Sequence, residues 1–285
     1  MQTLINELTN ETVSELTDAQ QAYLDLLKKV LTRFIGQEEF AELIFNRRSW
    51  QEHFFRPVKS LLATKGYTLC KRVPFDANAR KHGLDWPASA ETMAGLLRLD
   101  NIEYCVRQVI RDRVPGDLVE TGVWRGGSCI LMRGILKAYA VEDRRVWLAD
   151  SFAGLPKSTH KEDLHWDFER YAQLAVSLEQ VQENFRKYGL LDEQVCFLKG
   201  WFKDTLPGAP IQNISVLRLD GDLYESTWDA IAALYPKLSR GGFLIVDDYG
   251  GIDSCRKAIH DYRDRFGISE PIHKVDQSCV FWRRS

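Results

Sequence analysis

Two stretches, Leu217-Arg218-Leu219-Asp220-Gly221-Asp222 and Phe243-Leu244-Ile245-Val246-Asp247-Asp248, each run from an apolar segment into two acids. Apolar runs of this length, separated by a helix-like segment, are typical of neighbouring parallel strands. Ligands of open α/β sheets bind just beyond the carboxyl ends of such strands. Four acids that converge there would repel one another unless a hard cation lay between them, and oxygen-only ligation favours Mg²⁺. The sequence therefore predicts a metal site at this edge of a sheet.

Strand and helix patterns alternate through the second half of the chain. Apolar runs predict strands at 118–120, 146–150, 195–198, 216–219 and 243–246, with helical patterns between them at 128–140, 177–188, 227–238 and 254–266. This alternation predicts an α/β fold with a doubly wound, mostly parallel sheet. Segments 272–275 and 279–282 flank a turn at Asp276-Gln277-Ser278 and predict an antiparallel hairpin at the edge of the sheet.

The N-terminal third has a different pattern. Thr17-Asp18-Ala19-Gln20 has the form of a capping box before an apolar-periodic run that ends near Gly36. Segments 40–45 and 54–62 also look helical, 65–90 reads as irregular, and a further helix is expected over 90–112. We therefore expect an N-terminal helical cap with a mobile lid segment over residues 1–90, and a cofactor-binding domain over residues 91–285.

Composition excludes several classes of protein. The chain has 285 residues, a formal net charge of −2, 45% hydrophobic and 27% charged residues, which is ordinary for a globular protein. This charge gives no global attraction to nucleic acid or anionic lipid, and no apolar run is long enough to span a membrane. The N-terminus lacks a secretory signal, and the six cysteines are scattered without a CxxC pair. We expect a cytoplasmic protein with no nucleic-acid or membrane partner.

A glycine-rich turn follows the first predicted strand. Residues 120–128 read Glu-Thr-Gly-Val-Trp-Arg-Gly-Gly-Ser and open a helix, so the backbone can approach a ligand closely. The spacing of Gly122, Gly126 and Gly127 is not the dinucleotide GxGxxG pattern, and an acid at Glu120 would repel a pyrophosphate. A ligand that carries an amine and a positive sulfur, namely S-adenosylmethionine, suits this acid.

Asp150 closes the second predicted strand. A carboxylate at this position can accept both hydroxyls of a ribose, a role that nicotinamide enzymes share. A glycine-rich turn with capping acids is the alternative for either motif alone. Their occurrence at successive strand ends favours a cofactor site.

Several segments together resemble a known family. They are 91–96 (Glu-Thr-Met-Ala-Gly-Leu), 98–101 (Arg-Leu-Asp-Asn), 120–127, 149–152 (Ala-Asp-Ser-Phe), 197–207 (Phe-Leu-Lys-Gly-Trp-Phe-Lys-Asp-Thr-Leu-Pro), 219–227 (Leu-Asp-Gly-Asp-Leu-Tyr-Glu-Ser-Thr) and 246–249 (Val-Asp-Asp-Tyr). In this order and spacing, the chain resembles the macrocin O-methyltransferase family of antibiotic-sugar enzymes from about Asp85 to the C-terminus. The resemblance implies a Rossmann-like class I S-adenosylmethionine-dependent fold, a glycosylated acceptor, and a homodimer or larger assembly.

The resemblance also implies roles for individual residues. Together with the glycine-rich turn it predicts cofactor contacts from Thr92, Met93, Glu120, Gly122, Trp124, Arg125, Gly126, Ser128, Asp150, Ser151, Gly200 and Trp201. Asp220, Asp247 and Asp248 would hold Mg²⁺. The catalytic proton acceptor would be Asp220 or Asp222. Because a carboxylate held on a metal is a weak base, we favour Asp222; the alternative for Asp222 is a cap on the helix that opens near Ser226-Thr227.

Two other segments are candidates for contact with the acceptor. Pro156–Tyr171 is long, polar and aromatic, which is typical of a lid, and Phe75–Trp86 is the second candidate. His82, His160 and His165 lie in these segments and are rival substrate-binding groups. Two alternative functions stay open: a metal-dependent nucleotide-sugar glycosyltransferase that uses the Asp-Gly-Asp motif, and a non-catalytic binding module.

Overall fold

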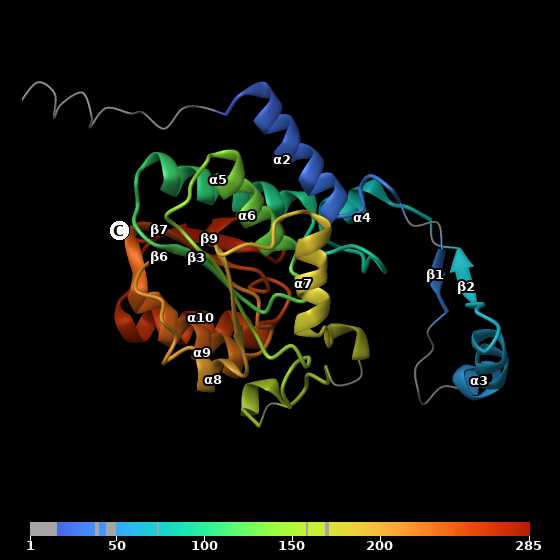
Figure 1. The fold of residues 1–285 in the computed structure, drawn as a ribbon. Helices are drawn as coiled ribbons and strands as arrows, with labels where there is room; N and C mark the ends of the chain where they lie inside the picture. The colour runs from blue at the N-terminus through green and yellow to red at the C-terminus, as the bar shows by residue number, and fades with distance from the viewer. Residues whose placement is uncertain (1–15, 38–39, 44–49, 73, 158, 169–170) are drawn as a thin grey trace, which may run out of the picture.

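The computed structural model describes residues 16–37, 40–43, 50–72, 74–157, 159–168 and 171–285. A seven-stranded sheet of order β5-β4-β3-β6-β7-β9-β8 forms its centre (Figure 1). The strands are β3 (Asp117–Thr121), β4 (Val146–Asp150), β5 (Val195–Lys199), β6 (Ile214–Leu219), β7 (Leu238–Val246), β8 (His273–Lys274) and β9 (Val280–Arg283). Strands β3 to β7 are parallel, whereas β9 pairs antiparallel with both β7 and β8. The predicted sheet and its C-terminal hairpin are confirmed.

Helices cover both faces of the sheet, which explains why its central strands are mostly apolar. Helices α5 (Leu96–Arg111), α6 (Gly127–Ala138) and α7 (Leu178–Lys187) lie on one face, and α9 (Tyr224–Leu234) and α10 (Asp253–Phe266) lie on the other (Figure 1). Side chains alternate accordingly: Leu118 and Val216 pack toward α5 and α6, while Val119 and Leu217 pack toward α9 and α10.

The first described helix joins this core. Helix α2 (Asp18–Leu31) begins at Thr17, whose side chain and that of Gln20 form the predicted capping box. Its residues Leu24, Leu27 and Leu31 are buried in the same cluster as α5 and α6. The division of the chain between residues 90 and 91 stays a prediction.

The segment after α2 departs from the sequence prediction. Phe40–Glu42, expected to be helical, is strand β1 and pairs antiparallel with β2 (Cys70–Arg72). A short apolar run does not distinguish helix from strand by periodicity, so the partner strand decided its conformation. Residues 44 and 45 lie outside the described part of the chain. Between the two strands, the helix predicted over 54–62 is present as α3 (Trp50–Ala63).

Other boundaries also differ from expectation. The irregular segment 65–90 contains β2 and a short helix, α4 (Ala77–Lys81), and the helix expected from residue 90 begins at Leu96. The residues just before Leu96 are not helical: Glu91 N–H donates to Leu31 O and Glu91 O accepts from Gly127 N–H, which ties this segment to α2 and α6. The helix predicted over 227–238 is present as α9 followed by the 3-10 turn η3 (Tyr235–Lys237), whereas no pattern predicted η1 (Lys161–Asp163), η2 (Ala172–Leu174) or α8 (Phe202–Thr205).

Strand β3 lies between β4 and β6. The strand order therefore reverses here: β4 and β5 are added on one side of β3, and β6 and β7 on the other. Open α/β sheets bind ligands beyond the strand ends at such a reversal. Among the described residues, no helix is both long and apolar enough to cross a bilayer.

Candidate functional site

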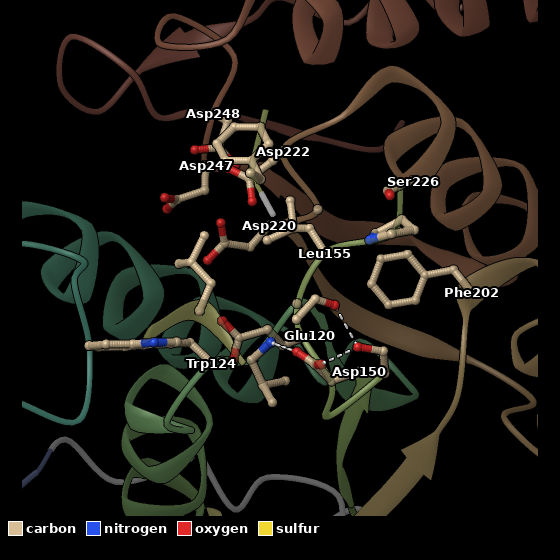
Figure 2. A pocket seen from close by; sticks show the side chains of 18 of the residues that line it. Glu120, Trp124, Asp150, Leu155, Phe202, Asp220, Asp222, Ser226, Asp247 and Asp248 are labelled. Atoms are coloured by element: carbon tan, nitrogen blue, oxygen red, sulfur yellow. Dashed lines mark hydrogen bonds between the residues drawn. The ribbon is translucent and has the colours of Figure 1, made fainter. Parts of the chain in front are cut away.

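A cavity of about 600 Å³ opens beyond the carboxyl ends of the central strands. Almost all of the predicted site residues line it: Thr92, Met93, Glu120, Gly122, Trp124, Ser128, Asp150, Ser151, Gly200, Trp201, Asp220, Asp222, Asp247 and Asp248. Figure 2 shows the four aspartates gathered on one side and Glu120 with Asp150 on the other. The sequence-based grouping of these residues therefore corresponds to one location in the fold.

The turn between β3 and α6 comes very close to the end of β6. Gly122 has a φ of +84°, and a Cβ there would lie 1.7 Å from Asp220 O. Only glycine fits this position, because the adjacent strands leave no room for a side chain. Gly126, with a φ of +86°, caps the N-terminus of α6. The turn thus brings the side of the cavity lined by Glu120 and Asp150 close to the side lined by the four aspartates.

Glu120 lies at the end of β3 and is only 1% exposed. One of its carboxylate oxygens accepts a hydrogen bond from Arg218 and the other accepts one from Cys129 Sγ at 2.6 Å. Burial, partly offset by the attraction of Arg218, raises the pKa of Glu120 to about 7. Glu120 can therefore change its charge near neutral pH.

Asp150 organises the neighbouring loop. Its two carboxylate oxygens accept backbone hydrogen bonds from Val123 N–H at 2.8 Å and Phe152 N–H at 2.7 Å. Burial raises the pKa of Asp150 although these backbone donors oppose the shift. Asp150 Oδ1 also accepts from Ser151 Oγ at 3.4 Å, and both residues line the cavity, where they could meet hydroxyl groups of a ligand.

Three aspartates have the geometry of a metal site. Asp220 follows β6, and Asp247 and Asp248 follow β7; each offers one oxygen, and these oxygens lie within 4.8 Å of one another. Asp248 Oδ2 is buried and has no hydrogen-bond partner among the described residues. A buried carboxylate oxygen without a partner is costly, and an all-oxygen set suits Mg²⁺ or Ca²⁺. The residues present therefore fit the predicted Mg²⁺ ion.

The aspartates differ in their electrostatic environments. Burial and the neighbouring acids raise the pKa of Asp248 and of Asp222 well above the ordinary value. Burial also acts on Asp247, but Arg218 and Arg98 outweigh it and lower its pKa. Arg98 opposes this rise at Asp248 only in part, and a divalent cation nearby would supply the further positive charge that keeps the carboxylate ionised.

Asp222 occupies a strained turn. Its φ is +59°, in the left-handed region that aspartate tolerates better than most residues. Helix α9, whose N-cap is Leu223, begins without a side-chain cap from its own N-cap residue. Asp163 of η1 instead accepts from Tyr224 N–H at 2.8 Å and from Glu225 N–H at 3.2 Å. The alternative reading of Asp222 as the helix cap is therefore wrong, and its side chain lines the cavity.

The Asp163 contact fixes the predicted lid segment to the aspartate loop. Asp163 is 1% exposed, although it lies in the polar segment between β4 and α7. We expect Asp163→Ala to lower the free energy of unfolding by about 1 kcal/mol, the usual cost of a lost cap, and to speed proteolysis within residues 156–175. Exposed Asp167 in the same segment provides the control, Asp167→Ala. Equal protease resistance of the two variants would disprove the fixing role of Asp163.

Aromatic contacts connect the two segments proposed to meet the acceptor. Trp86 and Tyr171 pack edge to face at 5.2 Å, and Phe168 contacts Tyr171 at 6.4 Å and stacks on Trp166 at 5.5 Å. Trp86 and Phe168 both line the cavity. The two segments therefore form one aromatic wall. His160 is part of neither wall nor cavity, because it stacks on Tyr224 with ring centroids 4.1 Å apart.

Two predicted cofactor residues do not line the cavity. Arg125 donates through Nη1 to Ala88 O and Ala90 O, at 2.7 and 2.9 Å, and so holds the preceding segment instead. Gly126 lies behind the turn, where a Cβ would meet Val181 Cγ1 at 2.9 Å. Both residues shape the turn from outside the cavity.

Two arginines at the site had no role in the sequence analysis. Arg98 and Arg218 are buried and donate to the acids of the cavity. A sequence signal existed for Arg218, because a charged residue within an apolar strand must find a buried partner. Arg98 also needs a buried partner, but the sequence does not indicate this, because charged residues are common on an amphipathic helix such as α5.

The sheet order, with an acid-lined cavity at the switch point, defines the class of protein as Rossmann-like α/β. The chain matches the macrocin O-methyltransferase (TylF) family over residues 20–284, and it belongs to that family. It is therefore an enzyme, an O-methyltransferase, and the glycosyltransferase and non-catalytic alternatives are not supported.

Relatives of known activity cover nearly the whole chain. The 8-demethyl-8-(2,3-dimethoxy-alpha-L-rhamnosyl)-tetracenomycin-C 4'-O-methyltransferase of Streptomyces olivaceus is 52% identical over 275 residues, or 94% of each chain. The mycinamicin III 3''-O-methyltransferase of Micromonospora griseorubida is 48% identical, over 93% of this chain and 97% of its own. The demethyldecarbamoylnovobiocin O-methyltransferase of Streptomyces niveus is 47% identical, over 96% and 98%.

Solved structures show the same architecture. The O-methyltransferase NovP superposes with a TM-score of 0.78 at 47% identity, covering 93% of this chain and 99% of that one. A calicheamicin methyltransferase has a TM-score of 0.55 at 18% identity, over 85% of this chain and 98% of its own, and so shares the fold.

Proposed function

We propose that this enzyme transfers a methyl group from S-adenosylmethionine to a hydroxyl on the sugar of a glycosylated natural product, and that it requires Mg²⁺. One observation carries the proposal: the Asp220, Asp247 and Asp248 oxygens converge at the same cavity that Glu120 and Asp150 line. A relative whose name includes a rhamnosyl acceptor, 52% identical to this chain, supports the sugar as the methylated group.

The cofactor half of the cavity divides into three parts. Glu120, beside Gly122, would accept a hydrogen bond from the amine of S-adenosylmethionine, and Ser128 at the start of α6 would lie near its carboxylate. Asp150 and Ser151 would bind the ribose hydroxyls. The remaining predicted contacts are Thr92, Met93 and Trp124, together with Gly200 and Trp201 on the adenine side.

The aspartate half would carry out the proton transfer. A divalent ion held by Asp220, Asp247 and Asp248 would supply Lewis-acid chemistry that lowers the pKa of an alcohol. Asp222, which belongs to the same loop as Asp220 but not to the metal set, would accept the hydroxyl proton.

The aromatic wall would close the site over the acceptor. Trp86 and Phe168 present apolar faces to the cavity, and such faces suit a sugar ring or a polyketide. Exclusion of water by this wall would protect the sulfonium from hydrolysis. We also infer a cytoplasmic homodimer or larger assembly without nucleic-acid or membrane partners, and these points stay predictions.

The proposal is tested by isothermal titration followed by a transfer assay. S-adenosylhomocysteine should bind, whereas NAD and UDP-sugars should not. With trideuteromethyl-labelled S-adenosylmethionine, mass spectrometry of a glycoside panel should show label on a sugar in the presence of Mg²⁺ and none after chelation. Binding of a UDP-sugar without binding of S-adenosylhomocysteine would disprove the proposal.

Binding of S-adenosylhomocysteine should depend on pH through Glu120. Because the pKa of Glu120 is about 7, the metal-free protein must release a proton before its carboxylate can accept from the ligand amine. Affinity should rise by about tenfold between about pH 6 and about pH 8. Glu120→Gln should bind weakly and without this dependence. A wild-type affinity that stays constant over the same range would exclude Glu120 as the amine acceptor.

A further inference from the structure

Arg218 lies at the centre of the acids that line the cavity. It comes from β6, is 1% exposed, and is the one charged residue of a strand whose residues are all buried. Its guanidinium donates to Glu120, to Asp220 Oδ2 at 2.6 Å and to Asp247. A single side chain therefore contacts acids from three adjacent strand ends, those of β3, β6 and β7.

Arg98 contacts the same cluster from α5, on one side only. It donates to Asp247 and, through Nε, to Asp276 Oδ2 at 2.7 Å. Asp276 is itself held by Ser278 N–H at 2.8 Å and Cys279 N–H at 2.7 Å. Arg98 thus links Asp247 to the turn of the C-terminal hairpin, and within the part of the chain that the structure describes no hydrogen bond or ion pair joins it to Glu120.

The acids of the cavity fall into two groups, those that contact an arginine and those that do not. A buried guanidinium is costly unless carboxylates pair with it, and its planar fork fixes the carboxylates that it contacts. Asp247 has one oxygen on each arginine. Asp248 and Asp222 have no arginine contact among the described residues. Asp248 is therefore available to bind the metal ion, and Asp222 to accept the proton.

We propose that Arg218 and Arg98 are positioning residues that act on different parts of the cavity. Arg218 positions Glu120 on the cofactor side together with Asp220 and Asp247 on the metal side, whereas Arg98 positions only Asp247 on the metal side. This inference rests on the proposed function, because it assigns Glu120 to the cofactor and Asp220 and Asp247 to the metal. Groups that orient metal ligands from behind typically change metal affinity by about 10- to 100-fold when removed.

Because the two arginines act on different parts of the cavity, the proposal can be tested by measurements of ligand affinity that do not depend on enzyme activity. S-adenosylhomocysteine affinity is measured by isothermal titration, and Mn²⁺ affinity by electron paramagnetic resonance of the free ion. Arg218→Gln should weaken both ligands by about 10- to 100-fold, and Arg98→Gln should weaken Mn²⁺ alone by this factor. The control is Arg133→Gln, a buried arginine paired with Asp192 at 2.7 Å outside the cavity, which should bind both ligands as the wild type does.

A lysine variant separates charge from geometry and covers the case in which Arg218→Gln does not fold. Lysine keeps the charge but lacks the fork, so Arg218→Lys should still bind both ligands at least about tenfold more weakly. Wild-type binding of both ligands by Arg218→Lys, or equal loss of both by Arg98→Gln, would overturn the proposal. If the wild-type protein bound neither ligand, the proposed function itself would fail, so the two failures are distinguishable.

Discussion

Replacing Asp248 by asparagine should reduce kcat by on the order of 10²- to 10³-fold while S-adenosylhomocysteine binds as it does to the wild type. The Asp248 carboxylate has a buried oxygen without a partner among the described residues, and it lies beside Asp220 and Asp247. An amide keeps the shape but loses the charge and one of the two equivalent oxygens. The cation should therefore bind poorly, and the cofactor half should be unaffected.

Asp248 is a better choice for this experiment than Asp247. Loss of Asp247 would remove one carboxylate partner from each of two buried guanidiniums, so a loss of activity could reflect misfolding. Exposed Asp253, at the start of α10, provides a control as Asp253→Asn. Turnover, unfolding temperature and S-adenosylhomocysteine affinity are measured for both variants. Full activity of Asp248→Asn in the presence of a chelator would refute the metal mechanism.

Asp222→Asn should lower kcat by about 10²- to 10⁴-fold, the usual contribution of a positioned general base. Asparagine tolerates the left-handed backbone at this position, so the turn should be preserved. Because Asp222 is not one of the three clustered metal ligands, Mn²⁺ affinity should change little.

The same variant distinguishes the two candidate proton acceptors. A large fall in kcat at unchanged Mn²⁺ and S-adenosylhomocysteine affinity supports Asp222. A variant with wild-type kcat would instead assign the proton to Asp220, which is also a metal-site acid. Asp229→Asn, which removes another cavity-lining acid outside the metal loop, shows whether loss of any nearby charge has the same effect.

The sheet and the position of the cavity could be predicted because both depend on short-range patterns. Strands buried on both faces are apolar at successive positions, and an acid that follows such a strand has few other places to lie. Asp220 and Asp247 are 27 positions apart, yet parallel neighbours bring their carboxyl groups together. The hairpin at β8 and β9 followed from the same reasoning.

Contacts between distant segments could not be predicted. Asp163 reaches the start of α9 across 61 positions, and Arg98 reaches Asp276 across 178, so no local spacing indicates either pair. The helix prediction for Phe40–Glu42 was wrong for a related reason, because this segment is a strand through its pairing with the distant β2. The buried arginines are the clearest example. A buried arginine needs carboxylate partners, but only the three-dimensional structure identifies which carboxylates these are.

One diffraction experiment examines the metal and the cofactor together. Crystals grown with S-adenosylhomocysteine and saturating Mn²⁺ should give an anomalous difference peak between the carboxylates of Asp220, Asp247 and Asp248, with the ligand amine near Glu120. Separated aspartate side chains without a peak between them, in crystals that contain bound S-adenosylhomocysteine, would rule out the magnesium-dependent mechanism.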